Sequence, residues 1–206
     1  KRALLSPFSV FRGPAHHNRV ALTFDDGPNP EFTLPVSSLL RQANARGTFF
    51  LVGEMIRKHP ELAQRLLDDG HEVANHSMSH PEIKNLPYAE FTAEIEDVYR
   101  LALPGGAKAI PNRYLRPPKG VVTLRLLYFC LTRGIRPVFW SQDPEDYRAR
   151  SAGEILAFFD RHPPRPGEII LLHDKTPHIV AALPGLLEKL EKLNLKPVSL
   201  SQLLAH

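Results

Sequence analysis

The sequence has 206 residues and a mass of 23.2 kDa, which suffices for one hydrophobic core and is short for two. With 43% hydrophobic and 23% charged residues it has the composition of a globular protein, and no apolar run approaches the ~18 residues that a membrane-spanning helix needs. The net charge is +4, but the basic residues are scattered and not interleaved with aromatic ones, which argues against a nucleic-acid partner. We expect a single domain over residues 1–206 that opens with a lead-in segment at 1–18.

The lead-in segment does not have the pattern of a signal peptide, because its apolar stretch is short and Pro7 interrupts it. We therefore expect an extracytoplasmic location if a leader or anchor precedes Lys1, and a cytoplasmic one otherwise. The single cysteine, Cys130, lies in the apolar run 124–131 and is predicted to be a buried hydrophobic side chain without a disulfide partner. No pattern in the sequence indicates the oligomeric state.

Apolar runs alternate with helical patterns along the chain. The predicted strands cover residues 20–24, 48–52, 71–75, 114–115, 135–140, 169–172 and 197–198. The predicted helices cover 33–46, 61–67, 88–101, 122–131, 154–159 and 179–193, the last with a kink at Pro184. About seven βα units without an internal repeat predict a parallel sheet, either open or closed into a trimmed barrel, since eight-unit barrels run to ~250 residues. In both cases the site belongs at the carboxyl ends of the strands.

Two adjacent carboxylates, Asp25 and Asp26, stand where the first predicted strand ends and a Gly27-Pro28 turn begins. Like charges this close resist ionising together unless a cation or a hydrogen-bond donor compensates one of them, and a metal ion does so readily. The alternative is a polar turn at a strand end, for which Asp and Gly are ordinary residues.

The third predicted strand runs into Asn75-His76-Ser77-Met78-Ser79-His80-Pro81. Histidines four residues apart share one face of a helical turn, which is the spacing that lets two imidazoles bind one metal ion. With Asp26 they make a set of two imidazoles and one carboxylate, which leaves coordination positions open for water and substrate. The motif alone is a weak signal, and a structural histidine pair is the alternative.

Three further strand ends carry polar groups. Arg116-Pro117-Pro118-Lys119-Gly120 combines a rigid turn with an arginine suited to holding a carboxylate, although a surface loop is the alternative. An acidic loop with Asp146 and Tyr147 follows the next strand, which ends near Trp140. Leu171-Leu172-His173-Asp174 ends an apolar strand, where a lone histidine is more often a core residue than a catalyst.

Together, these motifs resemble those of a known family. Thr-Phe-Asp-Asp-Gly-Pro, His-Ser-x-x-His-Pro, Arg-Pro-Pro-x-Gly, Asp-x-x-Asp-Tyr and Leu-x-His-Asp, in this order, are similar to the five motifs of the polysaccharide deacetylases, carbohydrate esterase family 4 with the NodB homology domain. The resemblance covers about residues 20–204. It implies an α/β fold, a distorted (β/α)7 barrel, and a divalent metal, zinc first with cobalt, nickel or manganese as alternatives, that serves to remove acetyl groups from a glycan.

The resemblance also implies a role for each site residue. Asp25 would be the general base, held by Arg116, and His173 the general acid, tuned by Asp146. The implied metal ligands and substrate-binding residues are Asp26, His76 and His80 for the metal, and Lys119, Tyr147, Leu171 and Trp140 for the substrate. Within that set, Leu171 would contact the acetyl methyl group and the backbone amide near Lys119 would face the oxyanion.

Two positions depart from the family pattern. Lys119 stands where an aromatic residue is common, and Tyr147 where tryptophan is common. Both border the substrate, so the glycan preference is open between peptidoglycan, chitin oligomers and another polysaccharide. A deacylase acting on a small amide or a lipid-linked sugar is the alternative within the enzyme class. A glycan-binding module without catalysis is the alternative outside it.

Overall fold

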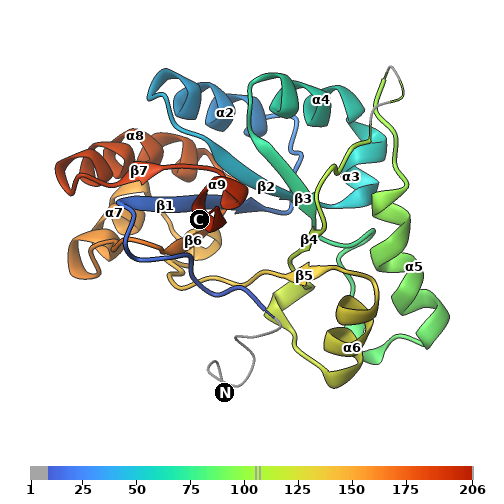
Figure 1. Cartoon of the computed structure of the whole chain (residues 1–206). Helices are drawn as coiled ribbons and strands as arrows, with labels where there is room; N and C mark the ends of the chain where they lie inside the picture. Colours follow the sequence, from blue (N-terminus) through green and yellow to red (C-terminus); the bar gives the residue numbers. More distant parts are fainter. Residues whose placement is uncertain (1–8, 105, 107, 206) are drawn as a thin grey trace.

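The computed structural model describes residues 9–104, 106 and 108–205, and shows a parallel sheet wrapped by helices (Figure 1). The strands are β1 (Arg19–Asp25), β2 (Gly47–Leu51), β3 (Glu72–Asn75), β4 (Tyr114–Leu115), β5 (Arg136–Pro137), β6 (Ile169–His173) and β7 (Lys196–Pro197). Six of them follow the order β5-β4-β3-β2-β1-β6, and β7 pairs with the start of β1. All these pairings are parallel, as the alternation of strands and helices predicts.

The sheet curls until its two ends meet. The chain that follows β5 pairs with β6 through a parallel bridge between Gln142 and Ile170. The amide of Ser141 donates to the carbonyl of Ile169 at 2.9 Å, and the amide of Leu171 donates to the carbonyl of Gln142 at 3.0 Å. This closure confirms the expected distorted (β/α)7 barrel and excludes the alternative of an open sheet. The barrel is irregular at β4 and β5, which are only two residues long.

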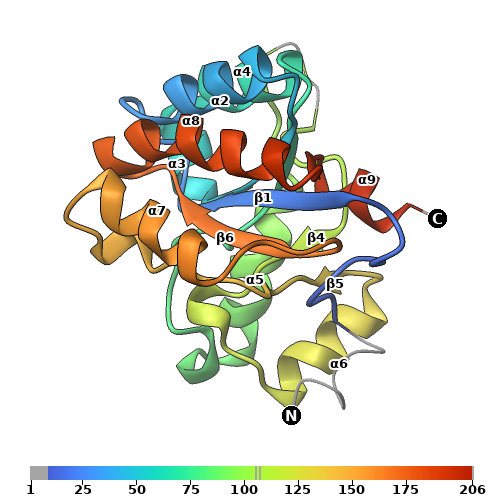
Figure 2. The same ribbon diagram turned by 90° about the vertical axis from the view of Figure 1, so that its left-hand side faces the viewer.

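Helices flank the sheet, most of them on its outer side (Figures 1 and 2). They are α2 (Thr33–Gln42), α3 (Gly53–Lys58), α4 (Pro60–Asp68), α5 (Tyr88–Tyr99), α6 (Leu124–Thr132), α7 (Ala152–Arg161), α8 (Pro177–Lys192) and α9 (Leu200–Leu204). The last helix packs through Leu200 and Leu203 on the other face of the sheet, near the start of β1. Helix α2 ends earlier than predicted because Asn44 takes a left-handed conformation with φ 53°. Helix α7 starts earlier because the Ser151 side chain accepts a hydrogen bond from the Glu154 amide and caps it. Helices α3 and α9 were not predicted.

The main core cluster lies between the sheet and the outer helices, and a second cluster that includes Ala21, Phe50 and Ile169 lies on the other face of the sheet. Strand β1 is buried from Val20 to Asp25, and the Phe24 ring stacks on Phe49 of β2 with centroids 4.9 Å apart. Cys130 is 1% exposed, so the prediction of a buried hydrophobic side chain is confirmed, and burial raises the pKa of its thiol to about 12. Among the described residues no helix has both the length and the hydropathy to cross a bilayer.

Candidate active site

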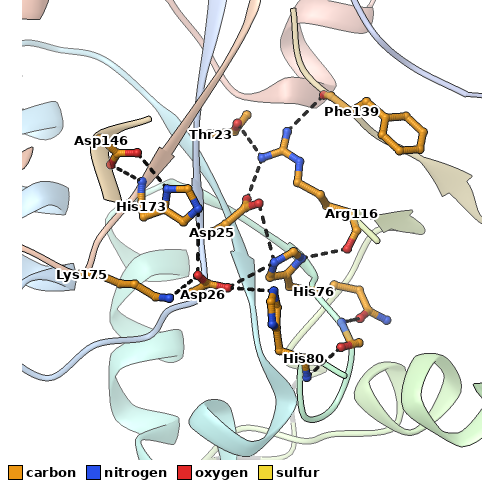
Figure 3. Close-up of polar contacts among 12 residues, drawn as sticks. Thr23, Asp25, Asp26, His76, His80, Arg116, Phe139, Asp146, His173 and Lys175 are labelled. Atoms are coloured by element: carbon orange, nitrogen blue, oxygen red, sulfur yellow. Dashed lines mark hydrogen bonds and ion pairs between the residues drawn. The ribbon is translucent and has the colours of Figure 1, made fainter. Parts of the chain in front are cut away.

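A cavity of about 470 Å³ opens at the carboxyl ends of the barrel strands. Its walls hold nine of the eleven residues proposed from the sequence: Asp25, Asp26, His76, His80, Lys119, Trp140, Tyr147, Leu171 and His173. The other two, Arg116 and Asp146, are buried behind the wall and bond to Asp25 and His173 (Figure 3). A convergence of residues from separate strand ends is what a parallel barrel produces.

Asp25 and Asp26 point to different partners because the backbone changes conformation between them. Asp25 is the last residue of β1 and only 3% exposed, whereas Asp26 takes φ 75°, a left-handed conformation that Asp tolerates better than most residues. The following Gly27 has no room for a side chain, since a Cβ there would lie 2.7 Å from a carboxylate oxygen of Asp174. The turn therefore directs Asp25 toward Arg116 and Asp26 toward the histidines (Figure 3).

Arg116 is completely buried and fixes Asp25. Its Nη1 donates to Asp25 Oδ1 at 2.6 Å and to Thr23 Oγ1 at 2.8 Å. Its Nη2 donates to the carbonyl of Phe139 at 3.2 Å, and the guanidinium lies 4.1 Å from the ring centroid of Phe50. A charge this deeply buried is tolerated only when paired, so Arg116 and Asp25 depend on each other. One oxygen of Asp25 is thereby held, and the carboxylate reaches the cavity with the other.

Asp26, His76 and His80 form the one group of three candidate metal ligands found in the described part of the chain. Nε2 of His76 and Nε2 of His80 lie 3.3 and 3.4 Å from the same oxygen, Oδ1 of Asp26. The candidate ligand atoms all lie within 4.8 Å of one another. One divalent ion can therefore contact all three side chains.

The prediction of a helical turn between His76 and His80 is wrong. Residues 76–80 form a loop in which Ser77 and His80 take left-handed conformations, with φ 68° and 58°. The Ser77 amide donates to Asn75 Oδ1 at 2.7 Å, and the His80 amide donates to Ser77 Oγ at 3.1 Å. Proline at 81 disfavours a helical conformation at His80, which is consistent with this loop.

The hydrogen bonding of His76 fits a metal ligand. Its Nδ1 lies 2.8 Å from the carbonyl oxygen of Arg116, and a carbonyl can only accept, so Nδ1 carries the hydrogen. In the neutral ring Nε2 then has a free lone pair directed at Asp26 and His80. A backbone carbonyl that orients a ligating imidazole in this way is a usual feature of metal sites. The donor set of two imidazoles and a carboxylate fits zinc, cobalt or nickel.

The neighbours of Asp26 favour its ionised carboxylate. Burial alone would raise its pKa, but hydrogen bonds and charge from His76 and Lys175 hold that pKa far below its usual range. The Lys175 ammonium contacts Oδ2, the oxygen that faces away from the two histidines. The two carboxylate oxygens thus have separate partners, imidazoles on Oδ1 and an ammonium on Oδ2 (Figure 3).

His173 lies on the opposite side of Asp26 from His76 and His80. Its Nδ1 is 2.8 Å from Asp146 Oδ1, and its backbone amide donates to Asp146 Oδ2 at 2.8 Å. Burial lowers the pKa of His173, but the hydrogen bond to Asp146 and the charges of Asp25, Asp146 and Asp26 outweigh it and raise that pKa above its ordinary value. His173 is therefore more readily protonated than a free histidine, with Nε2 toward the cavity and 4.0 Å from Asp26 Oδ2.

The substrate-facing wall combines apolar and basic side chains. Trp140 packs against Gly120, where a Cβ would lie 2.7 Å from the indole ring, so the loop needs glycine there. The Tyr147 ring meets His173 edge-on with centroids 5.1 Å apart. Lys119 is half-exposed, takes φ 56°, and pairs with Glu82 at 3.1 Å. Leu171 is 4% exposed and lines the floor.

Three groups at the site were not predicted. Lys175 follows the Leu-x-His-Asp motif with nothing in its spacing to mark it, and Thr23 bonds both Arg116 and the carbonyl of Ile170. Asp174 is fully buried and receives a hydrogen bond from Thr33, while its Oδ1 has no partner among the described residues. Burial raises the pKa of Asp174 to about 7 against the effect of that hydrogen bond. In the sequence, Asp174 is marked only as the last residue of the Leu-x-His-Asp motif, and the motif assigns it no role.

A second cavity, of about 890 Å³, is larger but lacks a group of side chains suited to catalysis. Residues of α2 and α8, including Leu39, Pro184 and Glu188, line it together with the chain before β7. Its walls contain no histidine or cysteine, and none of the three candidate metal ligands. We therefore choose the smaller cavity as the candidate active site, because it holds the cluster of titratable side chains, although it is not the larger of the two.

Residues 12–138 match the family model described as polysaccharide deacetylase. The chain belongs to the polysaccharide deacetylase family. A chitooligosaccharide deacetylase from Bradyrhizobium sp. is 39% identical over 162 residues, which are 77% of this chain and 71% of the relative. A peptidoglycan-N-acetylglucosamine deacetylase from Bacillus cereus is 33% identical over 199 residues, which are 94% of this chain and 91% of the relative.

Solved structures of this family agree with the fold. The crystal structure of a peptidoglycan N-acetylglucosamine deacetylase superposes with a TM-score of 0.90 at 28% identity, over 98% of this chain and 96% of that one. A family 4 carbohydrate esterase pseudoenzyme from Bacillus anthracis gives a TM-score of 0.87 at 25% identity, over 98% of this chain and 70% of that one. The same fold thus occurs with and without activity, and the argument for catalysis has to come from the site residues.

Proposed function

We propose that this chain is a metal-dependent deacetylase that removes the N-acetyl group from N-acetylglucosamine-type residues of a glycan, such as peptidoglycan or chitin oligomers. The observation that carries the proposal is the convergence, in one cavity, of a three-residue metal-ligand group, a carboxylate held by a buried arginine and a histidine held by a buried carboxylate. Family membership and the deacetylases among the relatives support it.

In the proposed reaction, Asp25 is the base. When bound by Asp26, His76 and His80, the divalent cation, which we propose to be zinc, supplies positive charge that acidifies water and polarises the acetyl carbonyl. Asp25 takes the proton of the attacking water on the oxygen that Arg116 leaves free, Oδ2, while Oδ1 stays bound to the guanidinium. The two adjacent aspartates thus have different roles, since Asp26 binds the cation and Asp25 moves the proton.

His173 completes the cleavage as the acid. An amide nitrogen leaves poorly unless it is protonated, and a histidine whose pKa is raised by Asp146 holds the required proton more readily than a free histidine does. The backbone amide of Lys119 and the side chain of Leu171 complete the proposed pocket, the first toward the carbonyl oxygen and the second toward the methyl group. Trp140 and Tyr147 offer ring surfaces to the sugar.

Acetate release from an N-acetylglucosamine oligomer tests the proposal. A chelator should abolish release, and added zinc or cobalt should restore it. Asp25→Asn should lose turnover by about 10²–10⁴-fold yet keep its metal, because Asp25 is not among the ligands. Release of acetate at the wild-type rate after complete metal removal would contradict the proposal. A panel of small amides and other acyl groups run in parallel identifies the preferred substrate.

A further inference from the structure

Helix α6 carries an exposed apolar face. Leu124, Tyr128 and Leu131 are 86%, 70% and 62% exposed, and they account for three of the six large hydrophobic side chains that are exposed in the described part of the chain. Their spacing of four and three residues puts them on one face of the helix, while Leu126, Phe129 and Cys130 on the other face are buried. We call these three exposed residues the α6 patch.

The α6 patch lies in a stretch without acidic residues. Residues 98–142 contain eight Lys and Arg and no Asp or Glu. Four of these eight, Arg100, Arg116, Lys119 and Arg133, pair with acidic residues outside the stretch. The other four, Lys108, Arg113, Arg125 and Arg136, have no ion-pair partner among the described residues and leave this region with unbalanced positive charge. The basic residues are scattered along the sequence, whereas the acidic residues are unevenly distributed.

Three arginines gather at the carboxyl end of α6. Arg113 Nη2 donates to the carbonyl of Arg133 at 2.8 Å, and the Arg136 amide donates to the carbonyl of Arg113 at 2.9 Å. All three residues are exposed. Arg133 pairs with Glu96 at 3.0 Å, while Arg113 and Arg136 have no ion-pair partner among the residues described. The Arg113 guanidinium also lies over the Tyr99 ring, 4.6 Å from its centroid, so its remaining N–H groups and the Arg136 guanidinium are left for an anion next to the α6 patch.

From this arrangement we propose that α6 docks the protein on an anionic lipid bilayer. Leucine and tyrosine side chains enter the boundary between headgroups and acyl chains, and neighbouring arginines bind lipid phosphates, which is the pattern of interfacial helices. Both views place α6 at the margin of the molecule, away from α2, so a flat surface can reach it (Figures 1 and 2). Leu124 is five residues beyond Lys119 of the cavity wall, so docking brings the cavity close to the bilayer.

A second copy of the chain fits the patch less well. Stable interfaces bury about 800 Å² on each partner, usually with an apolar centre, and three side chains on one nine-residue helix offer much less. Two copies in contact through this face would also bring their unpaired arginines together. A bilayer needs only shallow insertion and gains from the same positive charge.

Flotation with vesicles tests the proposal without using enzyme activity. Wild type should bind vesicles of phosphatidylcholine with phosphatidylglycerol at least tenfold more tightly than vesicles of phosphatidylcholine alone. The variant Leu124→Ser/Tyr128→Ser/Leu131→Ser should lose about tenfold or more of this binding. Arg113→Gln/Arg136→Gln should lose about fivefold for each arginine, and mainly on the anionic vesicles.

Matched controls use exposed residues elsewhere on the surface. Leu193→Ser removes an exposed leucine beyond α8, and Arg57→Gln/Arg150→Gln removes two exposed arginines, so both should bind vesicles within about twofold of wild type. All variants should stay folded, as judged by circular dichroism, and release acetate from soluble oligomers equally, which separates this proposal from the enzymatic one. Equal vesicle binding by patch and control variants would overturn it. The proposal would also be overturned if analytical sedimentation showed that the wild type is a dimer and that the Leu124→Ser/Tyr128→Ser/Leu131→Ser variant is a monomer.

Discussion

His76 and His173 line the same cavity, on two sides of Asp26, and differ in what holds their Nδ1 atoms. His76 donates to the neutral carbonyl of Arg116, whereas His173 donates to the carboxylate of Asp146, in each case at 2.8 Å. A carbonyl fixes the tautomer without adding a full charge, so Nε2 of His76 stays available as a ligand. A carboxylate favours the imidazolium, so Nε2 of His173 can carry a proton.

This difference shows that the role of a histidine depends on its second contact. Both residues come at strand ends and both face Asp26, on Oδ1 for His76 and on Oδ2 for His173. The sequence motifs place the imidazoles, but the assignment of metal ligand and proton donor follows from groups 27 and 40 residues away in the chain. Three substitutions separate the two roles.

The largest effect is expected for His173→Ala. Without the proton donor, kcat should fall by about 10²–10⁴-fold, because the amine leaves unprotonated. The zinc Kd, measured by competition with a chelator, should stay within about twofold of wild type, since His173 is not in the ligand group. A variant that also loses zinc would mean that the two histidines do not have separate roles.

Asp146→Asn should convert His173 toward an ordinary histidine. The carboxylate raises the pKa of His173, so its removal lowers that pKa and leaves less imidazolium at a given pH. The alkaline limb of the kcat profile should therefore move to lower pH, by about one unit, with little change in the acidic limb. An unchanged alkaline limb would show that His173 is not the acid whose deprotonation limits the rate.

A smaller effect is expected for Lys175→Met. Its ammonium contacts Oδ2 of Asp26 and would compete with a bound metal ion for the charge of that carboxylate. Removing the ammonium should tighten zinc binding by about tenfold, whereas Lys119→Met removes the same charge from a lysine paired with Glu82 and should change the zinc Kd by less than about twofold. Equal zinc affinities in the two variants would mean that Lys175 does not act on the metal-ligand group.

The sequence could predict the site because its residues follow buried strands. In a parallel sheet the carboxyl ends of neighbouring strands share one edge, so motifs after β1, β3, β4, β5 and β6 must approach one another. Resemblance to the family supplied individual roles for those residues. The strand positions themselves follow from apolar runs such as 169–172, which β6 extends by one residue to His173.

The remaining features depend on loop geometry and long-range contacts. The spacing of His76 and His80 indicated a helical turn, but left-handed conformations at Ser77 and His80 bring the rings together in a loop. Lys175 contacts Asp26 because it follows β6, the neighbour of β1, and this contact joins residues far apart in the sequence. Short helices such as α9 are too brief for a periodic pattern, and the Ser199 and Gln202 capping box that stabilises α9 became evident only in the structure.

The central claim is that one divalent ion binds between Asp26, His76 and His80. Calorimetric titration of the metal-free protein with zinc tests it most directly. We predict one bound zinc ion per chain for the wild type, retention of that ion by His173→Ala, and its loss in His76→Ala with a Kd weakened by at least about 100-fold. Zinc bound by His76→Ala as tightly as by the wild type would contradict the account.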